Sequence, residues 1–384
     1  MVIYEPREDS FLLEKHVKKL AVGSVLDMCT GSGIQAAAAA ENKKVRKVLA
    51  VDVNKEAIDY ARKNSAHKKI KYILSDLFAK VPKQKFDTII CNPPYLPQQA
   101  QIRDIATEGG KLGYEFIEKF LAEAGSYLKH NGNILLVFSS LTDKNMVHTL
   151  LEQYLFSYKF VDSVHYFFEE IYVYNIIKSK IAKELEKIGV DDIRYLARGK
   201  RGRVYTAKYK SKKVAVKIKR QDSEAVGRIA NEIKMLKMLN KYSIGPKLVT
   251  HDKTWLVYEF VYGEYIRDWL PKTSKSQAKK VLSIVFEKCK TLDELCIDKE
   301  EMHHPSKHVI VGKKTEFIDF ERAHKTNKPK NVSQFCHFIM SNKRLLEKKG
   351  FKIKMDKIIE MSRKYKQEMT EENFKAILKE VGLN

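Results

Sequence analysis

The most constraining feature of the sequence is an ordered alternation of short apolar runs and helical stretches in its first half. The apolar runs indicate buried strands and the stretches between them indicate helices. This order is typical of a doubly wound, mostly parallel α/β sheet, which binds its ligand at the carboxyl ends of the strands. The runs are residues 24–27, 48–52, 86–90 and 133–138, and the helical stretches are 55–64 and 114–128.

The pattern changes after an aromatic, β-rich segment at 161–177. A charged helical stretch follows, and beyond residue 191 a glycine turn, several strands and one helix lead into mostly helical sequence. A length of 384 residues also exceeds that of a typical single domain. We therefore predict a first domain at 1–179, a linker helix at 180–190 and a bilobal α+β domain, β-rich and then α-rich, at 191–384.

The net charge of +24 is unevenly divided. Residues 1–180 carry 25 basic and 21 acidic side chains, whereas residues 181–384 carry 47 and 27. A basic second half suits a polyanionic partner such as nucleic acid or nucleotide phosphates. A lysine-rich solvated surface explains the same excess, and composition does not separate the two interpretations.

The five cysteines include no C-x-x-C pair, so neither a disulfide framework nor a zinc site is predicted. Acidic residues occur near the N-terminus where a secretory signal needs basic and then apolar ones. The longest apolar runs are too short to cross a bilayer. We expect a soluble, cytoplasmic protein with no membrane partner.

A glycine-rich turn follows the first predicted strand. Gly31 and Gly33 allow close approach of the backbone to a ligand at a helix N-terminus, and Asp27 ends the strand before them. Asp52 ends the next strand, where a carboxylate can accept hydrogen bonds from both ribose hydroxyls. Ala36 completes a G-x-G-x-x-A pattern, so a nicotinamide site and a purely structural turn are both open at this point.

The segment Asn92-Pro93-Pro94-Tyr95 follows another strand and favours a different chemistry. An amide or ring-bound NH₂ is a poor nucleophile because its lone pair is delocalised. Two acceptors, the Asn92 side-chain oxygen and the Pro93 carbonyl, can hold its hydrogens and direct the lone pair outward. The prolines stiffen the turn, and Tyr95 can stack on the planar group.

These features, together with Asp76 at the end of another strand, occur in order along one sheet edge. Residues 1 to about 179 resemble the HemK-type S-adenosylmethionine-dependent methyltransferases, which modify a glutamine side chain of translation release factors. The opening E-P-R-E-D-S at residues 5–10 resembles their archaeal and eukaryotic branch in particular.

The resemblance implies a role for each matching residue. Asn92, Pro93 and Tyr95 would hold the substrate nitrogen. The cofactor is expected to contact Asn92 as well. The resemblance implies that Asp27, Gly31 and Gly33 line its methionine end and that Asp9 and Ser10 lie near its carboxylate. It also implies that Asp52 holds the ribose and that Asp76 contacts the adenine. The branch also implies a small zinc-binding activator subunit as a partner.

Two other acceptors are compatible with the same motif. Adenine-N6 methyltransferases share it, but an enzyme acting on nucleic acid needs a surface that reads or extrudes a base, and the first half is nearly neutral. Lysine methylation is possible too, although an ammonium must first lose a proton. Protein glutamine is the favoured acceptor, with adenine as the alternative.

The second half contains a strand lysine and a helix glutamate in an arrangement that can position phosphates. Lys217 lies on the face of its strand opposite the valines, and Glu232 falls within the apolar stripe of the following helix. A carboxylate on a core-facing stripe is costly unless it is paired, and Lys217 is the expected partner. Beside the turn of Gly199 and Gly202, the pair is typical of protein kinases, although a purely structural ion pair is also reasonable.

Residues from about 190 to 384 resemble small atypical kinases of the RIO and lipopolysaccharide-kinase kind. Asp319, at a strand end before an aromatic residue, matches their metal-binding aspartate. Glu301 would replace the catalytic aspartate, and His308 stands where asparagine would bind magnesium, for which histidine is a poor ligand. The resemblance implies ATP with Mg²⁺ as a ligand, while phosphoryl transfer and a pseudokinase docking role are both open.

The sequence thus predicts a methyltransferase with a translation release factor as methyl acceptor, fused to an ATP-binding kinase-like domain. The basic second half makes association with the ribosome or RNA a further expectation.

Overall fold

The computed structural model describes residues 3–98, 107–198, 202–219 and 228–383. The chain divides into two compact units, one of Met1–Leu196 with Ala207–Ser211 and the other of Ala197–Thr206 with Lys212–Asn384. No described helix is both long enough and apolar enough to cross a membrane.

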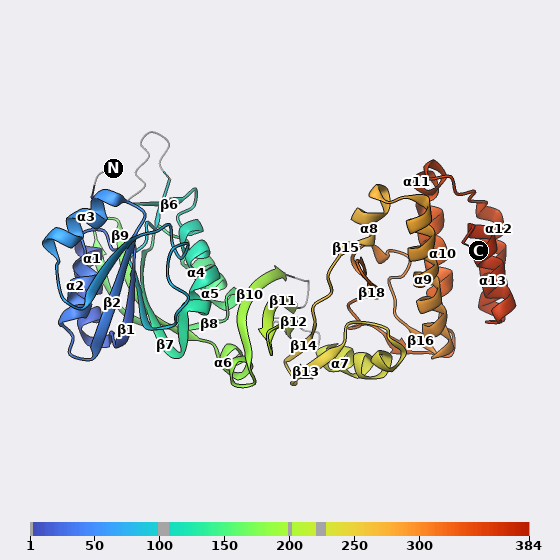
Figure 1. Ribbon diagram of the computed structural model, residues 1–384, viewed down its shortest axis with the longest axis horizontal. Coiled ribbons are helices and arrows are strands. Elements are labelled where there is room, and N and C mark those ends of the chain that lie inside the picture. The colour runs from blue at the N-terminus through green and yellow to red at the C-terminus, as the bar shows by residue number, and fades with distance from the viewer. Residues whose placement is uncertain (1–2, 99–106, 199–201, 220–227, 384) are drawn as a thin grey trace. The chain divides into compact units, whose positions relative to one another are not determined.

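The first unit is built on a seven-stranded sheet in the order β3-β2-β1-β4-β7-β9-β8 (Figure 1). The pairs from β3 to β7 are parallel, and β9 is antiparallel to both β7 and β8. The order reverses at β1, which places a ligand-binding crevice at the carboxyl ends of β1 and its neighbours. The strands are β1 (Gly23–Met28), β2 (Val45–Asp52), β3 (Ile70–Leu74), β4 (Phe86–Cys91), β7 (Leu128–Ser139), β8 (Phe156–Tyr166) and β9 (Glu169–Lys178).

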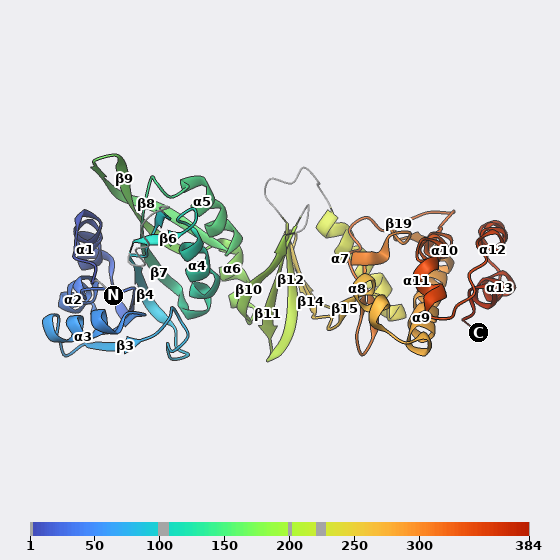
Figure 2. The same ribbon diagram turned by 90° about the horizontal axis from the view of Figure 1, so that it is seen from above.

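Helices cover both faces of this sheet, with α4 and α5 opposite α1 and α2 in both ribbon views (Figures 1 and 2). A short pair, β5 (Leu96–Pro97) and β6 (Glu108–Gly110), lies outside the main sheet. The predicted α/β class is therefore observed. The helices are α1 (Glu8–Leu20), α2 (Ile34–Glu41), α3 (Lys55–Asn64), α4 (Glu115–Tyr127), α5 (Lys144–Gln153) and α6 (Lys180–Lys187).

The predicted linker helix is α6, and it packs against the first unit. Ser179 caps its N-terminus by accepting a hydrogen bond from the Ala182 amide, and Leu185 is fully buried. Glu186 forms an ion pair with Lys178 and a hydrogen bond with His130. The helix is thus an integral part of the first unit rather than a free connection.

A five-stranded sheet follows in the order β10-β11-β12-β14-β13, with β14 antiparallel to both β12 and β13. Most of β10 and the end of β11 are grouped with the first unit, whereas β12 to β14, α7 and the mostly helical region after them belong to the second. Strands and helices follow the predicted order from β-rich to α-rich. The strands are β10 (Val190–Arg198), β11 (Gly202–Tyr209), β12 (Lys212–Lys219), β13 (Leu248–His251), β14 (Trp255–Glu259), β15 (Glu264–Tyr265), β16 (Ile297–Asp298), β17 (Val309–Val311), β18 (Thr315–Phe317) and β19 (His324–Lys325).

One hydrophobic core joins α7 to the helical region of this unit. Fully buried aromatic side chains from α9, α10 and α13 meet in it, with Phe286 4.7 Å from Phe335 and 6.5 Å from Phe374 between ring centroids. The α-helices are α7 (Arg228–Leu239), α8 (Ile266–Trp269), α9 (Lys275–Glu294), α10 (Asn331–Ser341), α11 (Lys343–Lys348), α12 (Met355–Gln367) and α13 (Glu371–Val381), and the 3-10 helices are η1 (Asn240–Tyr242), η2 (Leu270–Lys272) and η3 (Pro305–Lys307).

Candidate functional sites

A cavity of about 270 Å³ lies at the carboxyl ends of β1, β2 and β4 in the first unit. Its walls also include the start of α1 and the start of β9. Among the residues predicted from the sequence, those in its lining are Asp9, Ser10, Gly31, Asp52, Asn92, Pro93 and Tyr95.

The glycine turn and Asp52 form one wall of this cavity. Gly31 has a φ of 52°, and its amide donates to Asp52 Oδ2 at 2.9 Å, while the Asn54 amide donates to Oδ1 at 2.9 Å. Two backbone donors therefore fix the carboxylate, and each oxygen retains a lone pair for a ligand hydroxyl.

Three predicted cofactor residues are absent from the described lining of the cavity. Gly33, at a φ of 88°, lies where a Cβ atom would come within 3.0 Å of Ala61 and Ser65, so its glycine serves packing against α3. Asp27 is fully buried beneath the turn, and Asp76 is exposed just after β3.

Asp27 carries an unusual carboxylate. Thr30 Oγ1 donates to its Oδ2 at 2.6 Å, but its buried Oδ1 has no hydrogen-bond partner among the described residues. Burial raises the pKa of Asp27 to about 7. Below that pH the buried carboxyl is mostly protonated.

Asp9 organises the other end of the cavity. Asn92 Nδ2 donates to Asp9 Oδ2 at 3.0 Å, and the hydroxyls of Tyr4 and Tyr95 lie 3.1 and 3.4 Å from its two oxygens. The Ser10 amide donates to Asp9 Oδ1 at 2.6 Å. Asp9 and Ser10, expected near the cofactor carboxylate, thus contact the Asn92 side chain, which lies 83 positions away in the sequence.

This network fixes the orientation of the Asn92 amide. Because Nδ2 donates to Asp9 and lies 3.4 Å from Ser10 Oγ, Oδ1 is the free end of the group. The oxygen is buried, and no described residue donates to it. A buried acceptor without a donor is costly, so its geometry suits an incoming N–H group.

Tyr95 is almost fully buried in the cavity wall. Burial and then the charge of Asp9 raise the pKa of its phenol far above the usual range, so the hydroxyl stays protonated and can only donate to the carboxylate. The ring is thereby fixed beside the Asn92 side chain.

Two glycines that the sequence analysis did not single out support the turn at 92–95. A Cβ atom on Gly109 would lie 2.6 Å from the Pro94 carbonyl oxygen, and one on Gly113 would lie 2.4 Å from that of Tyr95. Backbone thus packs directly on backbone here. The run Glu108-Gly-Gly-Lys-Leu-Gly113 is the sequence pattern that would have indicated it.

Glu169 is a second residue that the sequence did not reveal. It begins β9 and lines the cavity, and its buried Oε2 has no partner among the described residues. Nothing in the local sequence marks it, because it follows two exposed phenylalanines in an ordinary hairpin turn.

In the second unit, Lys217 on β12 lies among three carboxylates. Its Nζ is 2.7 Å from Glu232 on α7, 3.0 Å from Asp319 and 3.5 Å from Glu321. Burial disfavours the charged amine, but Glu232 and Asp319 outweigh it and hold the pKa of Lys217 well above its usual range. Gly202 packs beside this lysine, whereas Gly199 lies outside the described residues.

Asp319 stands in the left-handed region with a φ of 63°. The buried Lys299 donates to its carbonyl oxygen at 3.0 Å, and the Phe320 amide donates to Glu232 Oε1 at 3.3 Å. Helix α7, β12 and the segment after β18 are therefore connected through polar contacts at one point.

Glu301 and His308 contact one another rather than a shared ligand position. Glu301 Oε2 is 3.0 Å from His308 Nε2, and its Oε1 is 2.7 Å from Arg322. Burial, followed by the charge of Lys299, lowers the pKa of His308. Both carboxylate oxygens of Glu301 are thus engaged, which does not suit a catalytic base.

Both predicted magnesium ligands contact protein groups in the structure. Mg²⁺ prefers several oxygen ligands, whereas Asp319 Oδ1 is held by Lys217 and His308 offers a nitrogen that Glu301 occupies. No group of three potential metal ligands of the His, Cys, Asp or Glu type exists in the part of the chain that the structure describes.

Comparison with family models matches two parts of the chain. Residues 8–168 match the methyltransferase small domain. Residues 190–305 match the protein tyrosine and serine/threonine kinase family, a range that ends before His308 and Asp319.

Several curated proteins are similar to the first half. The "Putative protein N5-glutamine methyltransferase" of Methanocaldococcus jannaschii is 34% identical over 180 residues, which cover 45% of this chain and 90% of that protein. The ribosomal protein uL3 glutamine methyltransferase of Bordetella pertussis is 37% identical over 30% of this chain and 44% of its own length. The release factor glutamine methyltransferase of Koribacter versatilis is 33% identical over 34% of this chain and 53% of its own length. The chain thus spans about half the length of these two bacterial relatives.

Among solved structures, the E. cuniculi Mtq2–Trm112 complex, described as responsible for methylation of the eRF1 translation termination factor, is 24% identical. The match covers 47% of this chain and 100% of that chain, with a TM-score of 0.39.

Proposed function

The chain belongs to the protein N5-glutamine methyltransferase family, and from that premise we propose that its first half methylates the side-chain amide of a protein glutamine in a translation release factor. The observation that carries this proposal is the buried Asn92 Oδ1 in the cavity wall, which has no hydrogen-bond partner among the described residues. A primary amide has the N–H groups that such an acceptor requires.

The chemistry of the amide sets what the site must do. Asn92 Oδ1 accepts one N–H of the substrate and the Pro93 carbonyl accepts the other, so the nitrogen lone pair points away from both. Asp9 keeps the Asn92 amide from rotating, because a flipped side chain would turn its carbonyl oxygen toward the Asp9 carboxylate, which offers no hydrogen to it. Acceptors fixed in this way contribute without reorganising during the reaction.

The residues of the first wall fit S-adenosylmethionine, which supplies an electrophilic methyl group when bound. Asp52 retains a lone pair on each oxygen for the ribose hydroxyls, and the Gly31 backbone leaves open space beside it. The methionine end of the cofactor is assigned to the neighbourhood of Asp27, which is buried beneath the turn and lies outside the described lining of the cavity. Asp76 at the end of β3 is assigned to the adenine.

The methylated nitrogen loses one proton. It becomes acidic only as it is alkylated, so no strong base is needed beforehand. Glu169 Oε2, unpartnered among the described residues and in the cavity lining, is placed to receive that proton.

The decisive test is transfer of labelled methyl from S-adenosylmethionine to a release factor bearing a Gly-Gly-Gln segment. Asn92→Ala should lower kcat by roughly 10²–10³-fold, the cost of removing one preorganised hydrogen-bonding group, while cofactor affinity measured by calorimetry is unchanged. Asn64→Ala, at an exposed helix position, is the matched control.

Near-full activity of Asn92→Ala would overturn the mechanism. Label recovered in RNA or DNA rather than in the glutamine of the release factor would establish the adenine-N6 alternative instead.

A small zinc-binding activator is part of the same proposal. Its presence should raise the methylation rate of the purified chain and slow its aggregation. Full activity of the chain by itself, unchanged by added activator, would remove this partner from the proposal.

For the second half we propose a kinase-like nucleotide-binding module with a docking role. The supporting observation is the Lys217 cluster, in which an anionic phosphate could replace Asp319 and Glu321 as partner of the lysine. The two engaged oxygens of Glu301 favour binding over phosphoryl transfer.

The full chain should bind ATP with Mg²⁺ in calorimetry without releasing labelled phosphate, and Lys217→Met should abolish binding. Turnover that is lost in Glu301→Gln would overturn the docking role in favour of a kinase. Absence of binding would overturn the nucleotide assignment itself.

A further inference from the structure

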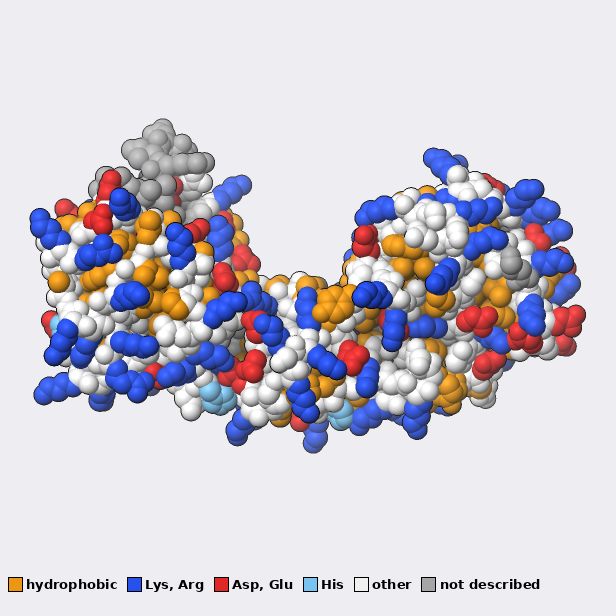
Figure 3. All heavy atoms as spheres, in the orientation of Figure 1, with side chains coloured by type: hydrophobic (Ala, Val, Ile, Leu, Met, Phe, Trp, Pro, Cys, Tyr) orange, Lys and Arg blue, Asp and Glu red, His pale blue; other side chains and the backbone are white. Residues whose placement is uncertain are grey.

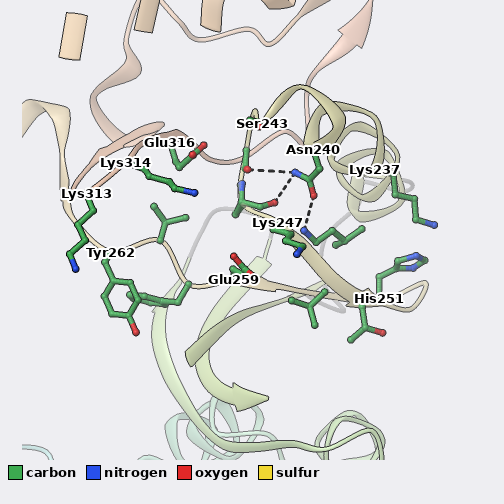
Figure 4. A pocket seen from close by; sticks show the side chains of 17 residues that line it. Lys237, Asn240, Ser243, Lys247, His251, Glu259, Tyr262, Lys313, Lys314 and Glu316 are labelled. Atoms are coloured by element: carbon green, nitrogen blue, oxygen red, sulfur yellow. Dashed lines mark hydrogen bonds between the residues drawn. The ribbon is translucent and has the colours of Figure 1, made fainter. Parts of the chain in front are cut away.

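A basic cleft in the second unit lies apart from the Lys217 cluster. It occupies about 1290 Å³ between the end of α7, the loop into β13, the segment after β14 and the turn between β17 and β18 (Figure 4). Pockets for small ligands are usually about 300–1000 Å³. The cleft is therefore large enough for an extended ligand.

Lysine is the main charged residue of its lining. Glu259 and Glu316 are the acidic residues, and Glu316 is neutralised by Lys288 at 2.8 Å. The lysines are exposed, and none of them forms an ion pair with another described residue: Lys237, Lys247, Lys313 and Lys314.

These lysines are spread along the cleft rather than gathered at one point. Figure 4 shows Lys237 and His251 at one side, Lys313 and Lys314 at the other, and Lys247 between them. Partial desolvation and then the nearby Lys237 lower the pKa of His251, while Asp252 opposes this shift.

Helix α7 extends this arrangement beyond the cleft. Lys234 and Lys237 are exposed on one face of α7, and the exposed Lys241 follows them in η1. They line a shallow cavity of about 540 Å³ that shares Lys237 with the cleft. A polyanion can thus follow a continuous row of cations.

Aromatic rings accompany the lysines. Tyr262 is 63% exposed, and its ring centroid lies 5.0 Å from that of Phe260 at an angle of 72°. Lys213 Nζ lies 4.0 Å above the Phe260 ring. Exposed aromatic faces next to a basic groove are typical of proteins that bind single-stranded nucleic acid, because unpaired bases stack on them.

The floor of the cleft is held in place by Asn240. Its Nδ2 donates to the carbonyls of Ile244 and Pro246 at 3.2 and 3.1 Å, and its Oδ1 accepts from the Leu248 amide at 2.8 Å. The loop that carries Lys247 is therefore preorganised, which lowers the entropy cost of binding.

The excess of charge by itself locates no binding surface, since Lys and Arg side chains are spread over the visible face of both halves (Figure 3). The cleft differs in combining volume, exposed lysines that have no ion-pair partner among the described residues, and the exposed ring of Tyr262. We propose that it binds single-stranded nucleic acid, with phosphates on the lysines and a base stacked on Tyr262. This proposal is independent of both activities proposed above.

The test uses the full chain and fluorescent oligouridine or oligothymidine of about 12 nucleotides, within the usual range of single-strand sites, in anisotropy titrations at several salt concentrations. A quadruple variant, K237Q/K247Q/K313Q/K314Q, should lose roughly tenfold or more in affinity. Its slope of log affinity against log salt should fall by about 0.7 for each phosphate contact removed.

The matched control, K348Q/K352Q/K354Q/K357Q, removes the same charge from exposed positions of the same unit and should retain near-full affinity. Tyr262→Ala should weaken binding by roughly 5- to 100-fold, whereas Tyr262→Phe retains the stacking face and should not. Circular dichroism verifies folding of every variant.

Equal losses in the two quadruple variants would show diffuse attraction and overturn the assignment to the cleft. Equal affinities of Tyr262→Ala and Tyr262→Phe would overturn base stacking. A polyglutamate peptide that competes as well as the oligonucleotide would assign the cleft to acidic protein instead.

Discussion

The two candidate sites differ in whether their buried polar atoms have hydrogen-bond or ion-pair partners. In the first unit, Asn92 Oδ1, Asp27 Oδ1 and Glu169 Oε2 have no partner among the described residues. In the second, Lys217 contacts three carboxylates, and Glu301 is held by two cationic or hydrogen-bonding partners. His308 Nδ1 is the exception there.

The difference changes the free-energy cost of binding a ligand at each site. A desolvated, unpaired acceptor costs about 1–3 kcal/mol, and a ligand donor removes that cost. The first site is therefore prepared for its ligand in advance. The second has satisfied its charges internally, so a ligand there must replace existing ion pairs before it gains anything.

The largest expected effect comes from breaking the internal pairing of the second site. Lys217→Met leaves Glu232 buried without its cation and should destabilise the second unit by about 3–5 kcal/mol. Hydrogen exchange of α7 amides would report this locally. The exposed Lys212→Met on the same strand is the control, and equal exchange in both variants would contradict the comparison.

The unpaired acid of the first unit should show the next largest effect, as a function of pH. Burial raises the pKa of Asp27 to about 7 from an ordinary 3.8. Between these values the folded chain keeps a proton that the unfolded chain releases, so stability falls as pH rises through the window.

The Asp27→Asn side chain cannot ionise, so the stability of this variant does not fall as pH rises through the window. Its stability advantage over the unmodified chain should therefore grow from about pH 4 to pH 7, by up to roughly 4 kcal/mol, in denaturant titrations of the ligand-free protein. Exposed Asp59→Asn is the control. A pH-independent difference would mean that Asp27 is ionised throughout.

A smaller effect is expected at Asp9, which acts through Asn92. Asp9→Asn should lower kcat for methyl transfer by about 10–100-fold, as is usual when a supporting hydrogen-bond partner is changed. The KM for the cofactor should change little, because Asp9 contacts Asn92 and the two tyrosines. The exposed Glu5→Gln removes the same charge and should change neither kcat nor KM. If Asp9→Asn instead raised the KM for the cofactor without lowering kcat, Asp9 would contact the cofactor carboxylate rather than support Asn92.

The smallest effects come from helix caps, and they test whether the units are stabilised separately. Ser179→Ala removes the N-cap of α6, and Ser274→Ala removes the N-cap of α9. Each substitution should lower the free energy of unfolding by about 1 kcal/mol. In calorimetry, Ser179→Ala should lower the unfolding temperature of the first unit only. Ser274→Ala should lower that of the second unit only. A shared shift would indicate cooperative unfolding of the whole chain.

Much of the fold followed from local sequence patterns. The helix predicted at 55–64 is α3, with Asn54 as its N-cap, and the apolar runs at 24–27 and 48–52 lie within β1 and β2. Periodicity and capping act over a few residues, so they are legible in the sequence. The carboxyl-end placement of the Gly31 and Asn92 motifs followed from strand order for the same reason.

The remainder depends on contacts between distant residues. Nothing near Asp9 indicates that its carboxylate meets Asn92, and nothing near Glu301 indicates that Arg322 binds it. Glu169 begins an antiparallel strand whose position in the sheet no local pattern determines. Such residues become visible only once the topology brings the strands together.

The position of Glu169 has a mechanical consequence. The hairpin of β9 and β8 forms one end of the sheet, and β8 pairs with β9 only, among the described strands. Parts of a protein open locally at different free energies, and core strands open last. A ligand held at Glu169 therefore stabilises one edge of the sheet, so that occupancy of the cavity should slow amide exchange along β8 as far as Phe156, at the opposite end of the hairpin.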